Sequence, residues 1–212
     1  PANYGDATGG IISVTTRGPS SFYFGGVDYL TSGFKLGDKT YGLDNYAYNL
    51  LEGSISGPLY SRTDSSGNKT PLLGFFFAGN ITAIADSRPF AVDQYRIKDS
   101  VRDNLINSIG IVSNIGDARQ PRVVYNTDFL RRDDFEKIKF RRNSANRGAN
   151  GSGKIDVDLG PTMNLTLGGT ASWNSSRNHG WARSLMNSDN NPLTTQLTYR
   201  AYTRFTQRFE NA

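Results

Sequence analysis

The sequence predicts an all-β chain of antiparallel strands, and three observations support this prediction. The 212 residues include 23 Gly, 12 Phe and 11 Tyr, a composition typical of strands and turns. Apolar and polar side chains alternate along several segments, which is the period of an extended strand. The connections between these segments alternate between short and long, as in outer-membrane barrels with turns at one end and loops at the other.

Residues 163–174, MNLTLGGTASWN, show the clearest alternation. About twelve alternating residues are twice the length of a typical globular strand, whereas a strand tilted across a bilayer needs about 9 to 11. Trp173 ends the apolar row, as an aromatic residue does where hydrocarbon meets the headgroups. We therefore expect Leu165, Leu167 and Trp173 to face lipid. One face packed on a soluble sandwich core would alternate in the same way.

The segment before it, KIDVDLGPT, predicts the partner strand of a hairpin. Ile155 and Val157 lie on one face, and Asp156 and Asp158 lie on the other. A Gly-Pro turn then leads into the strand at 163–174. Charges that gather on one face suit a water-filled lumen, so we expect the two aspartates to face the lumen and the two β-branched residues to face lipid.

Four further segments predict strands by the same criterion: 22–32, 49–60, 74–85 and 197–210. The facing of 22–32 is ambiguous, because Tyr23, Val27 and Tyr29 alternate with side chains of mixed character. In 49–60, Glu52 falls on the polar face. The last segment also fits a helix face by its arginine spacing, but its Thr and Tyr residues favour a strand, with these predicted lumen-facing residues: Arg200, Arg204 and Arg208.

The predicted connections differ in length according to the end of the sheet at which they lie. Short turns are expected at 58–72 and 160–162, and long connections at 33–45, 86–147 and 175–193. Outer-membrane barrels show this asymmetry, with turns on one side of the membrane and long loops on the other. Within the longest connection, Val101, Leu105, Ile109 and Val112 recur at helical intervals and predict a short amphipathic helix.

One segment carries the net charge of +5. Residues 119–147 contain nine Arg or Lys and four Asp or Glu, a balance of +5, while the rest of the chain is neutral. Basic residues interleaved with Phe fit nucleic-acid binding, but the intervening Asp133, Asp134 and Glu136 favour local salt bridges. The preferred interpretation is a solvated loop that meets anionic lipopolysaccharide or an anionic ligand, with no nucleic acid as partner.

The chain lacks the residues and segments that several other classes of protein require. No run of about 18 apolar residues exists for a membrane-spanning helix. The chain has no Cys and a single His, so it lacks the residues for a thiolate site and for most catalytic sites of hydrolases. An enzyme, a metal site and a cofactor site are therefore not expected. An acid pair of Glu52 with Asp156 or Asp158 is the one catalytic alternative.

Two motifs resemble one known family. YGDATGGIISVTTRGP, residues 4–19, resembles the junction in TonB-dependent outer-membrane transporters where the last plug strand leads into the first barrel strand. SGPLY followed by GFFFAGNIT resembles the first inter-strand turn of the Oar-like, carboxypeptidase-regulatory branch found in Bacteroidota, which are Gram-negative. The plug–barrel junction would then comprise Gly9, Gly10, Gly18 and Pro19.

The resemblance implies a piece of a larger membrane protein. Residues 1–18 would end the plug domain, and 19–212 would form about the first six strands of a barrel of about 22. Such a receptor binds a substrate at extracellular loops and admits it by active transport. Its partners would be the outer-membrane bilayer, a TonB-type energy-coupling protein that contacts plug regions not present here, the substrate, and a surface lipoprotein. A soluble secreted β-sandwich or adhesin-like module is the alternative.

Overall fold

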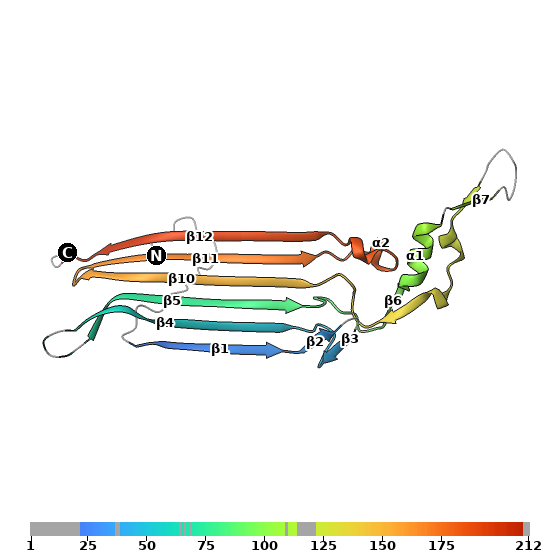
Figure 1. Cartoon of the computed structure of the whole chain (residues 1–212). Coiled ribbons are helices and arrows are strands. Elements are labelled where there is room, and N and C mark those ends of the chain that lie inside the picture. Colours follow the sequence, from blue (N-terminus) through green and yellow to red (C-terminus); the bar gives the residue numbers. More distant parts are fainter. Residues whose placement is uncertain are drawn as a thin grey trace, which may run out of the picture.

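A computed structural model describes residues 22–36, 39–63, 65, 67, 69–108, 110–113 and 122–209. The prediction of an all-β chain is confirmed, because most of these residues lie in antiparallel strands. Six long strands form one sheet in which consecutive long strands are neighbours (Figure 1). They are β1 (Phe24–Thr31), β4 (Asn49–Thr63), β5 (Lys69–Ile84), β10 (Asn146–Gly160), β11 (Met163–Arg177) and β12 (Leu193–Gln207).

The six strands match the six segments that alternation predicted. β4 and β5 are longer than expected, because they extend through Pro58 and Pro71 into the segment predicted as a turn. The register shifts between Pro58 and Ser61, so a bulge absorbs the missing proline N–H while the two strands continue. The predicted turn at 160–162 is confirmed: Gly160 has φ of 144° and its N–H bonds to Asp158 Oδ1.

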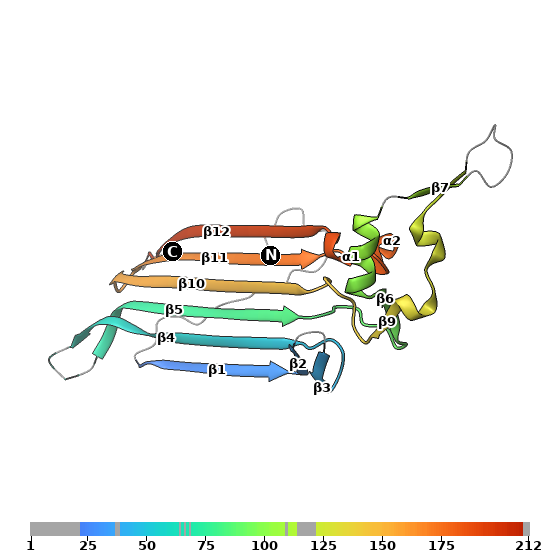
Figure 2. The same cartoon turned by 45° about the vertical axis from the view of Figure 1, so that its right-hand side comes forward.

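The end of the sheet opposite these turns carries smaller elements (Figure 2). The first connection holds a hairpin of β2 (Gly33–Leu36) and β3 (Lys39–Gly42). Its glycines allow the strands to approach closely, since a Cβ on Gly42 would lie 2.3 Å from Gly33 Cα. The last connection holds α2 (Trp181–Ser184) and η3 (Ser188–Asn190).

The connection between β5 and β10, residues 85–145, is called the cap below. It is more ordered than the long loop that the sequence predicted, and it contains α1 (Asp99–Asn107), which holds Val101 and Leu105 of the predicted amphipathic helix. Val112, predicted to lie on the same helix, is in a short strand instead, and Ile109 falls outside the described residues. Its other elements are β6 (Gln94–Ile97), β7 (Ile111–Ser113), β8 (Arg122–Val124), η1 (Asn126–Phe129), η2 (Arg132–Asp134) and β9 (Phe135–Ile138). β6 pairs with β9 and β7 with β8, so the cap consists of two small ribbons and a helix.

The long sheet has almost no hydrophobic core. Among the described residues, the buried apolar side chains are Ala47, Ile97 and Phe140, and all three lie in connections at the cap end. Within the same ranges, no helix is long and apolar enough to cross a membrane. The strands of 15 or 16 residues therefore leave their apolar side chains at least partly exposed in the described structure.

Candidate functional site

The register of the sheet divides its side chains into an apolar face and a polar face. On the apolar face, five successive cross-strand rows extend from Val157 to Ala149 of β10, nine residues along the strand. Nine residues are the length that a tilted strand needs to cross the hydrocarbon of a bilayer. The next row toward the cap is polar and contains Asn49, Arg147 and Ser175.

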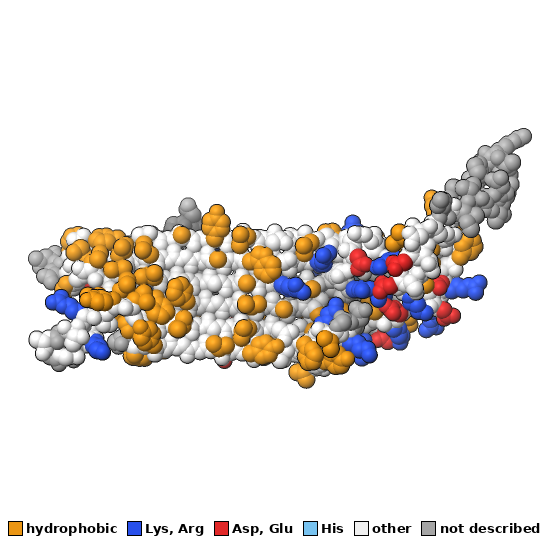
Figure 3. Space-filling model, in the orientation of Figure 1, with side chains coloured by type: hydrophobic (Ala, Val, Ile, Leu, Met, Phe, Trp, Pro, Cys, Tyr) orange, Lys and Arg blue, Asp and Glu red, His pale blue; other side chains and the backbone are white. Residues whose placement is uncertain are grey.

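Bulky side chains on the apolar face form two bands (Figure 3). The band near the turns gathers Leu73, Phe75, Phe77, Ile55, Ile155, Val157, Leu165, Leu167 and Phe205. The band near the cap gathers Tyr29, Leu51, Ile81, Trp173 and Leu197. Leu197 is 66% exposed and Ile81 is 58% exposed. This face is therefore apolar, exposed and continuous over all six strands.

Small residues separate the two bands. Gly53, Gly79 and Gly151 are neighbours in one row, and Ala171 continues that row on β11. The missing side chains leave a hollow of about 580 Å³ whose rim includes Val27, Trp173 and Leu197. On β4, β5, β10 and β11 the bulky side chains thus lie toward both ends of the apolar face and the small ones at its middle, while Val27 and Tyr199 end the middle row on β1 and β12.

The polar face carries a row of hydrogen-bonding side chains across the strands. Asn150 Nδ2 donates to Asn80 Oδ1 at 2.9 Å, and Ser172 Oγ donates to Asn150 Oδ1 at 2.6 Å. Asp28 and Glu52 continue this row on β1 and β4. The row borders a hollow of about 490 Å³, so this face offers carboxylate, amide and hydroxyl groups to a polar ligand.

The predicted lumen-facing residues lie on the polar face in the register. Asp156 is buried, accepts a hydrogen bond from Thr166 Oγ1 at 2.6 Å and lies 3.3 Å from Lys154 Nζ. Arg200 and Arg204 are placed beside Thr170 and Thr166 and form no ion pair with a carboxylate in the described ranges. Asp158 shares the face, and Arg208 follows the end of β12, where its N–H bonds to Thr162 O.

The predicted lipid-facing residues lie together on the opposite face: Ile155, Val157, Leu165, Leu167 and Trp173. The predicted junction residues Gly9, Gly10, Gly18 and Pro19 fall outside the described residues. The residues predicted to face lipid and those predicted to face the lumen therefore lie on opposite faces of the sheet, as the alternation along the sequence indicated. The facing of β1, which the sequence left ambiguous, is set by its register: Val27 and Tyr29 lie on the apolar face.

The structure does not bring the acid pair together. Glu52 is level with Asn150 across the sheet, and Asp156 lies six residues farther along β10. Six residues of strand separate the two carboxyl groups by about 20 Å, and Asp158 lies farther still. Paired catalytic carboxylates stand about 5 to 9.5 Å apart. In the described part of the chain, no three Asp, Glu, His or Cys side chains gather as metal ligands.

A buried ion pair fastens the base of the cap. The Asp86 side chain is fully buried and receives Arg141 Nη2 at 2.6 Å, Arg141 Nε at 3.0 Å and the Arg141 backbone N–H at 2.8 Å. Its Oδ1 also accepts the Arg88 N–H at 2.9 Å. These contacts span 55 residues of sequence, so they close the connection between β5 and β10 at its two ends.

A second network links the cap helix to the rest of the cap and to η3. Arg96 lies 2.9 Å from Asp99 and 2.5 Å from Glu136, and Arg102 lies 2.5 Å from Asp189. The hydrogen bond from Arg96, opposed by partial burial, lowers the pKa of Asp99 to about 2. The sequence predicted salt bridges within 129–147, whereas most of these partners come from outside that segment.

His179 lies close enough to the buried ion pair to feel the charges of both Arg141 and Asp86. Its ring centroid is 5.6 Å from that of Trp181, and Trp181 in turn packs against Phe90 at 5.2 Å. Both ring nitrogens of His179 are buried without a hydrogen-bond partner in the structure. Burial, with the charge of Arg141, lowers the pKa of His179. Burial therefore disfavours the charged form of this imidazole.

Comparisons with models of protein families, with curated proteins and with solved structures find no match for this chain.

Proposed function

We propose that this chain supplies transmembrane strands of an outer-membrane receptor of the TonB-dependent type. The receptor would bind its substrate at the long connections and admit it through a plugged barrel. The observation that carries the proposal is the exposed apolar face, five rows deep on β5, β10, β11 and β12, opposite a face of carboxylates, amides and arginines. Alternation of apolar-out and polar-in residues is the pattern of transmembrane barrels.

The alternative, a soluble secreted β-sandwich or adhesin-like module, needs a second layer on the apolar face. Sheets in sandwiches pack about 10 Å apart and bury both inner faces. The described residues provide no such layer, and soluble monomers rarely expose apolar patches beyond a few hundred Å². The apolar face therefore favours lipid over a second sheet.

The connections support the same orientation. The cap and the connection with α2 lie at one end of the sheet, while short turns join β4 to β5 and β10 to β11 at the other (Figure 1). In transmembrane barrels the long loops are extracellular. The cap, the β2–β3 hairpin and the α2 connection would then meet the substrate from outside, and the polar face would line its route.

Surface proteolysis of intact cells that express the full-length protein tests this topology. Trypsin added outside is expected to cut the cap at the exposed Arg131 and Arg132, and to spare Arg62 and Lys69 beside the β4–β5 turn until the outer membrane is permeabilised. The protein should sediment with the outer membrane and require detergent for extraction. Recovery in the soluble fraction, or cleavage of both ends from outside, would contradict the proposal.

Transport needs a separate test. Deletion of the receptor gene and deletion of the energy-coupling protein should abolish growth on the same nutrients, since the proposed uptake is active. Growth defects that do not overlap would leave a membrane protein with a different role.

A further inference from the structure

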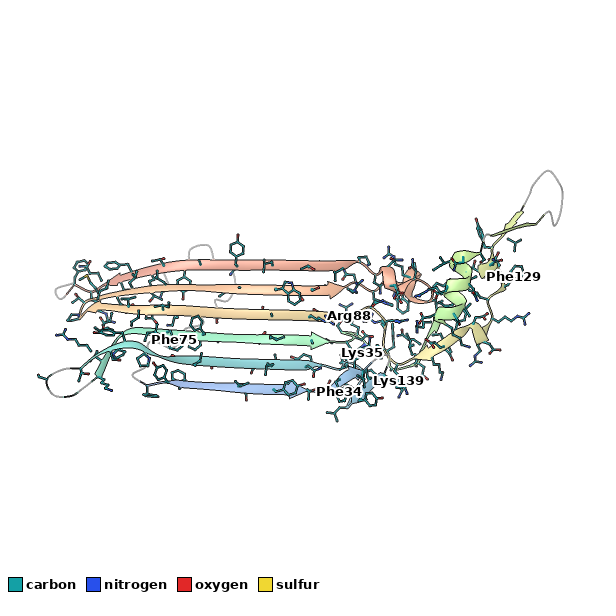
Figure 4. The ribbon with its side chains drawn as sticks, in the orientation of Figure 1. Phe34, Lys35, Phe75, Arg88, Phe129 and Lys139 are labelled. Carbon is teal, nitrogen blue, oxygen red and sulfur yellow. The ribbon has the colours of Figure 1, made fainter. Side chains whose placement is uncertain are left out.

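A small hollow lies on the cap where the α2 connection meets the β6–β9 ribbon. Its volume is about 330 Å³, and it is called the cap hollow below. The lining residues are Tyr95 of β6, Phe135 of β9, Leu185 of the α2 connection and Arg132 of η2. Segments far apart in the sequence therefore build one hollow with three apolar walls and one cation. Figure 4 shows the side chains of this end of the molecule.

The register of the ribbon explains why the two rings lie together. Tyr95 is opposite Lys137 in the ribbon. Ile97 is opposite Phe135, so all four side chains share one face. Tyr95 and Phe135 are diagonal neighbours on that face, a spacing that aromatic side chains can bridge. Ile97 is buried, whereas both rings keep part of their surface exposed, so the rings offer apolar surface to a ligand.

Hydrogen bonds and an ion pair hold the third apolar wall in place. The Ile97 N–H donates to Leu185 O at 2.8 Å, which fixes Leu185 beside the ribbon. Arg102 of α1 lies 2.5 Å from Asp189 Oδ2, and Asn143 Nδ2 donates to Asp189 Oδ1 at 2.6 Å. The α2 connection is therefore joined to the cap at two places, and its position beside the ribbon is set by these contacts.

The cation of the cap hollow has no counter-charge among the described residues. Arg132 is exposed and forms neither an ion pair nor a side-chain hydrogen bond with any of them. The lining contains no carboxylate. Asp133 follows Arg132 in the sequence but does not line the hollow, and Asp134 accepts the Arg131 N–H at 2.7 Å. An anion could therefore bind Arg132 without displacing an internal ion pair.

The charges around the cap hollow also favour an anion. Lys137, opposite Tyr95, lies 2.7 Å from Asp93 Oδ2, and this hydrogen bond lowers the pKa of Asp93. The charge of Lys139 lowers the same pKa further. Arg132 is close enough to Lys137 for its charge to oppose the rise in the pKa of that lysine. Three cations thus surround one carboxylate, and the balance is positive.

The size and the walls of the cap hollow define its ligand. An apolar cavity of about 150 Å³ holds one benzene molecule. A hollow of about 330 Å³ therefore has room for one ring and a short polar tail. The rings of Tyr95 and Phe135 suit an aromatic partner, and a guanidinium binds a carboxylate through two parallel N–H bonds. An inorganic anion would gain nothing from the three apolar walls.

We propose that the cap hollow binds a small molecule that carries an aromatic ring and a carboxylate. The ring lies among Tyr95, Phe135 and Leu185, and the carboxylate lies on Arg132. Binding itself does not depend on the membrane location argued above. That such a ligand is the receptor's substrate rests on the proposed function, because it is the proposed topology that would turn the cap toward the outside of the cell.

Equilibrium dialysis with radiolabelled N-acetylphenylalanine tests the proposal. The full-length protein is held in detergent micelles, and a parallel cell with empty micelles corrects for partition of the ligand into detergent. The acid should saturate a single site. N-acetylphenylalaninamide lacks the charge and N-acetylglycine lacks the ring. Each should bind about tenfold or more weakly, since a hydrogen bond to a charged group and the burial of a ring each contribute about that factor.

Two variants and a matched control make the result specific. Arg132→Gln should weaken binding of the acid about tenfold or more and leave the affinity for the amide unchanged. Leu185→Ala should weaken both ligands about fourfold or more, because the apolar wall loses surface. The control, Arg131→Gln, removes the same charge from the neighbouring exposed position outside the lining and should change neither affinity.

The outcomes separate this proposal from the proposed function. Equal affinities for the acid and the amide, or equal losses from Arg131→Gln and Arg132→Gln, would overturn the carboxylate site. Binding of N-acetylglycine as tight as that of the acid would overturn the role of the ring. Absence of saturable binding would remove the site and leave the membrane location intact. Specific binding by a protein that is recovered in the soluble fraction would support the site while contradicting the proposed function.

Discussion

At the scale of single residues, the contacts that matter most are those that no local pattern predicts. Asp86 and Arg141 are 55 residues apart, and each lies in a segment that the sequence assigned to one long loop. The sequence showed an excess of arginine but not which carboxylates would meet it. Partners that the chain brings together through tertiary structure leave no periodic signal, whereas alternation along a strand does.

Asp86→Asn should detach the base of the cap. The substitution leaves the Arg141 guanidinium buried without its counter-charge, and breaking a buried pair in this way costs about 3 to 5 kcal/mol. The rate of cleavage of the cap by proteinase K, in protein held in detergent, measures the effect. The control Asp93→Asn breaks the exposed pair with Lys137 and should not change the rate. Equal cleavage rates for the two variants would show that the buried Asp86–Arg141 pair stabilises the cap no more than the exposed Asp93–Lys137 pair does.

His179 should make the cap sensitive to mild acid. Burial lowers its pKa in the folded chain below the ordinary histidine value of 6.5, so the unfolded cap binds the proton more readily. The stability that the neutral imidazole contributes is complete above pH 6.5 and is lost as pH falls through the lower folded pKa. Resistance to proteinase K, corrected with an unfolded substrate at each pH, should decline over that window.

His179→Phe should abolish this decline. The ring keeps its packing against Trp181 but has no site for a proton, and it removes two buried nitrogens that lack partners. A pH profile that is the same in the variant would assign the acid sensitivity to other groups.

At the scale of elements, alternation predicted all six long strands and, for five of them, which residues share a face, because successive side chains of a strand point to opposite faces. Strand ends were predicted less well. Gly57, Pro58 and Pro71 are turn residues by composition, yet β4 and β5 run through them with a bulge. The β2–β3 hairpin was missed because four-residue strands are too short to show a period.

A charge on the apolar face should be far more damaging than one on the polar face of the same strand. Ala171→Arg introduces a guanidinium into the small-residue row midway between the two bands, and a lipid-facing Arg near the midplane costs about 2 to 4 kcal/mol. Thr170→Arg places the same charge on the polar face of β11. Urea titration of the full-length protein folded into phosphatidylcholine vesicles measures both. Similar losses would indicate that the apolar face does not contact lipid.

At the scale of the whole molecule, the sheet has two open edges in the described structure, β1 and β12. With the proposed membrane location, backbone groups along an open edge in hydrocarbon would cost several kcal/mol each, so both edges would require further strands. All fifteen residues of β12 are exposed, which is the greatest exposure of any long strand. The order of neighbouring strands could be predicted from the sequence because consecutive long strands pair with each other. The number of strands in a closed barrel could not be predicted, because the alternation within one strand does not depend on how many strands complete the barrel.

Hydrogen exchange should locate these edges. In the isolated chain held in detergent, amides of β5 and β10, which have neighbours on both sides, should exchange slowly, while half of those in β1 and β12 exchange fast. In the full-length protein the two outer strands should become as protected as the central ones. Mass spectrometry of proteolytic fragments distinguishes these cases, and fast exchange of β12 in the full-length protein would mean that nothing pairs with it.

The buried Asp86–Arg141 ion pair has a consequence for the rate at which the sheet forms. Each of the other long pairings joins segments close in sequence, but β5 and β10 are separated by the 61 residues from 85 to 145. Closing a loop between distant segments costs entropy, and this cost rises slowly, with the logarithm of the loop length, while folding slows as contacts become less local. Once Asp86 holds Arg141, only four residues, 142–145, remain before β10, and the search becomes local. Formation of the cap would then set the moment at which the two three-stranded halves join into one sheet.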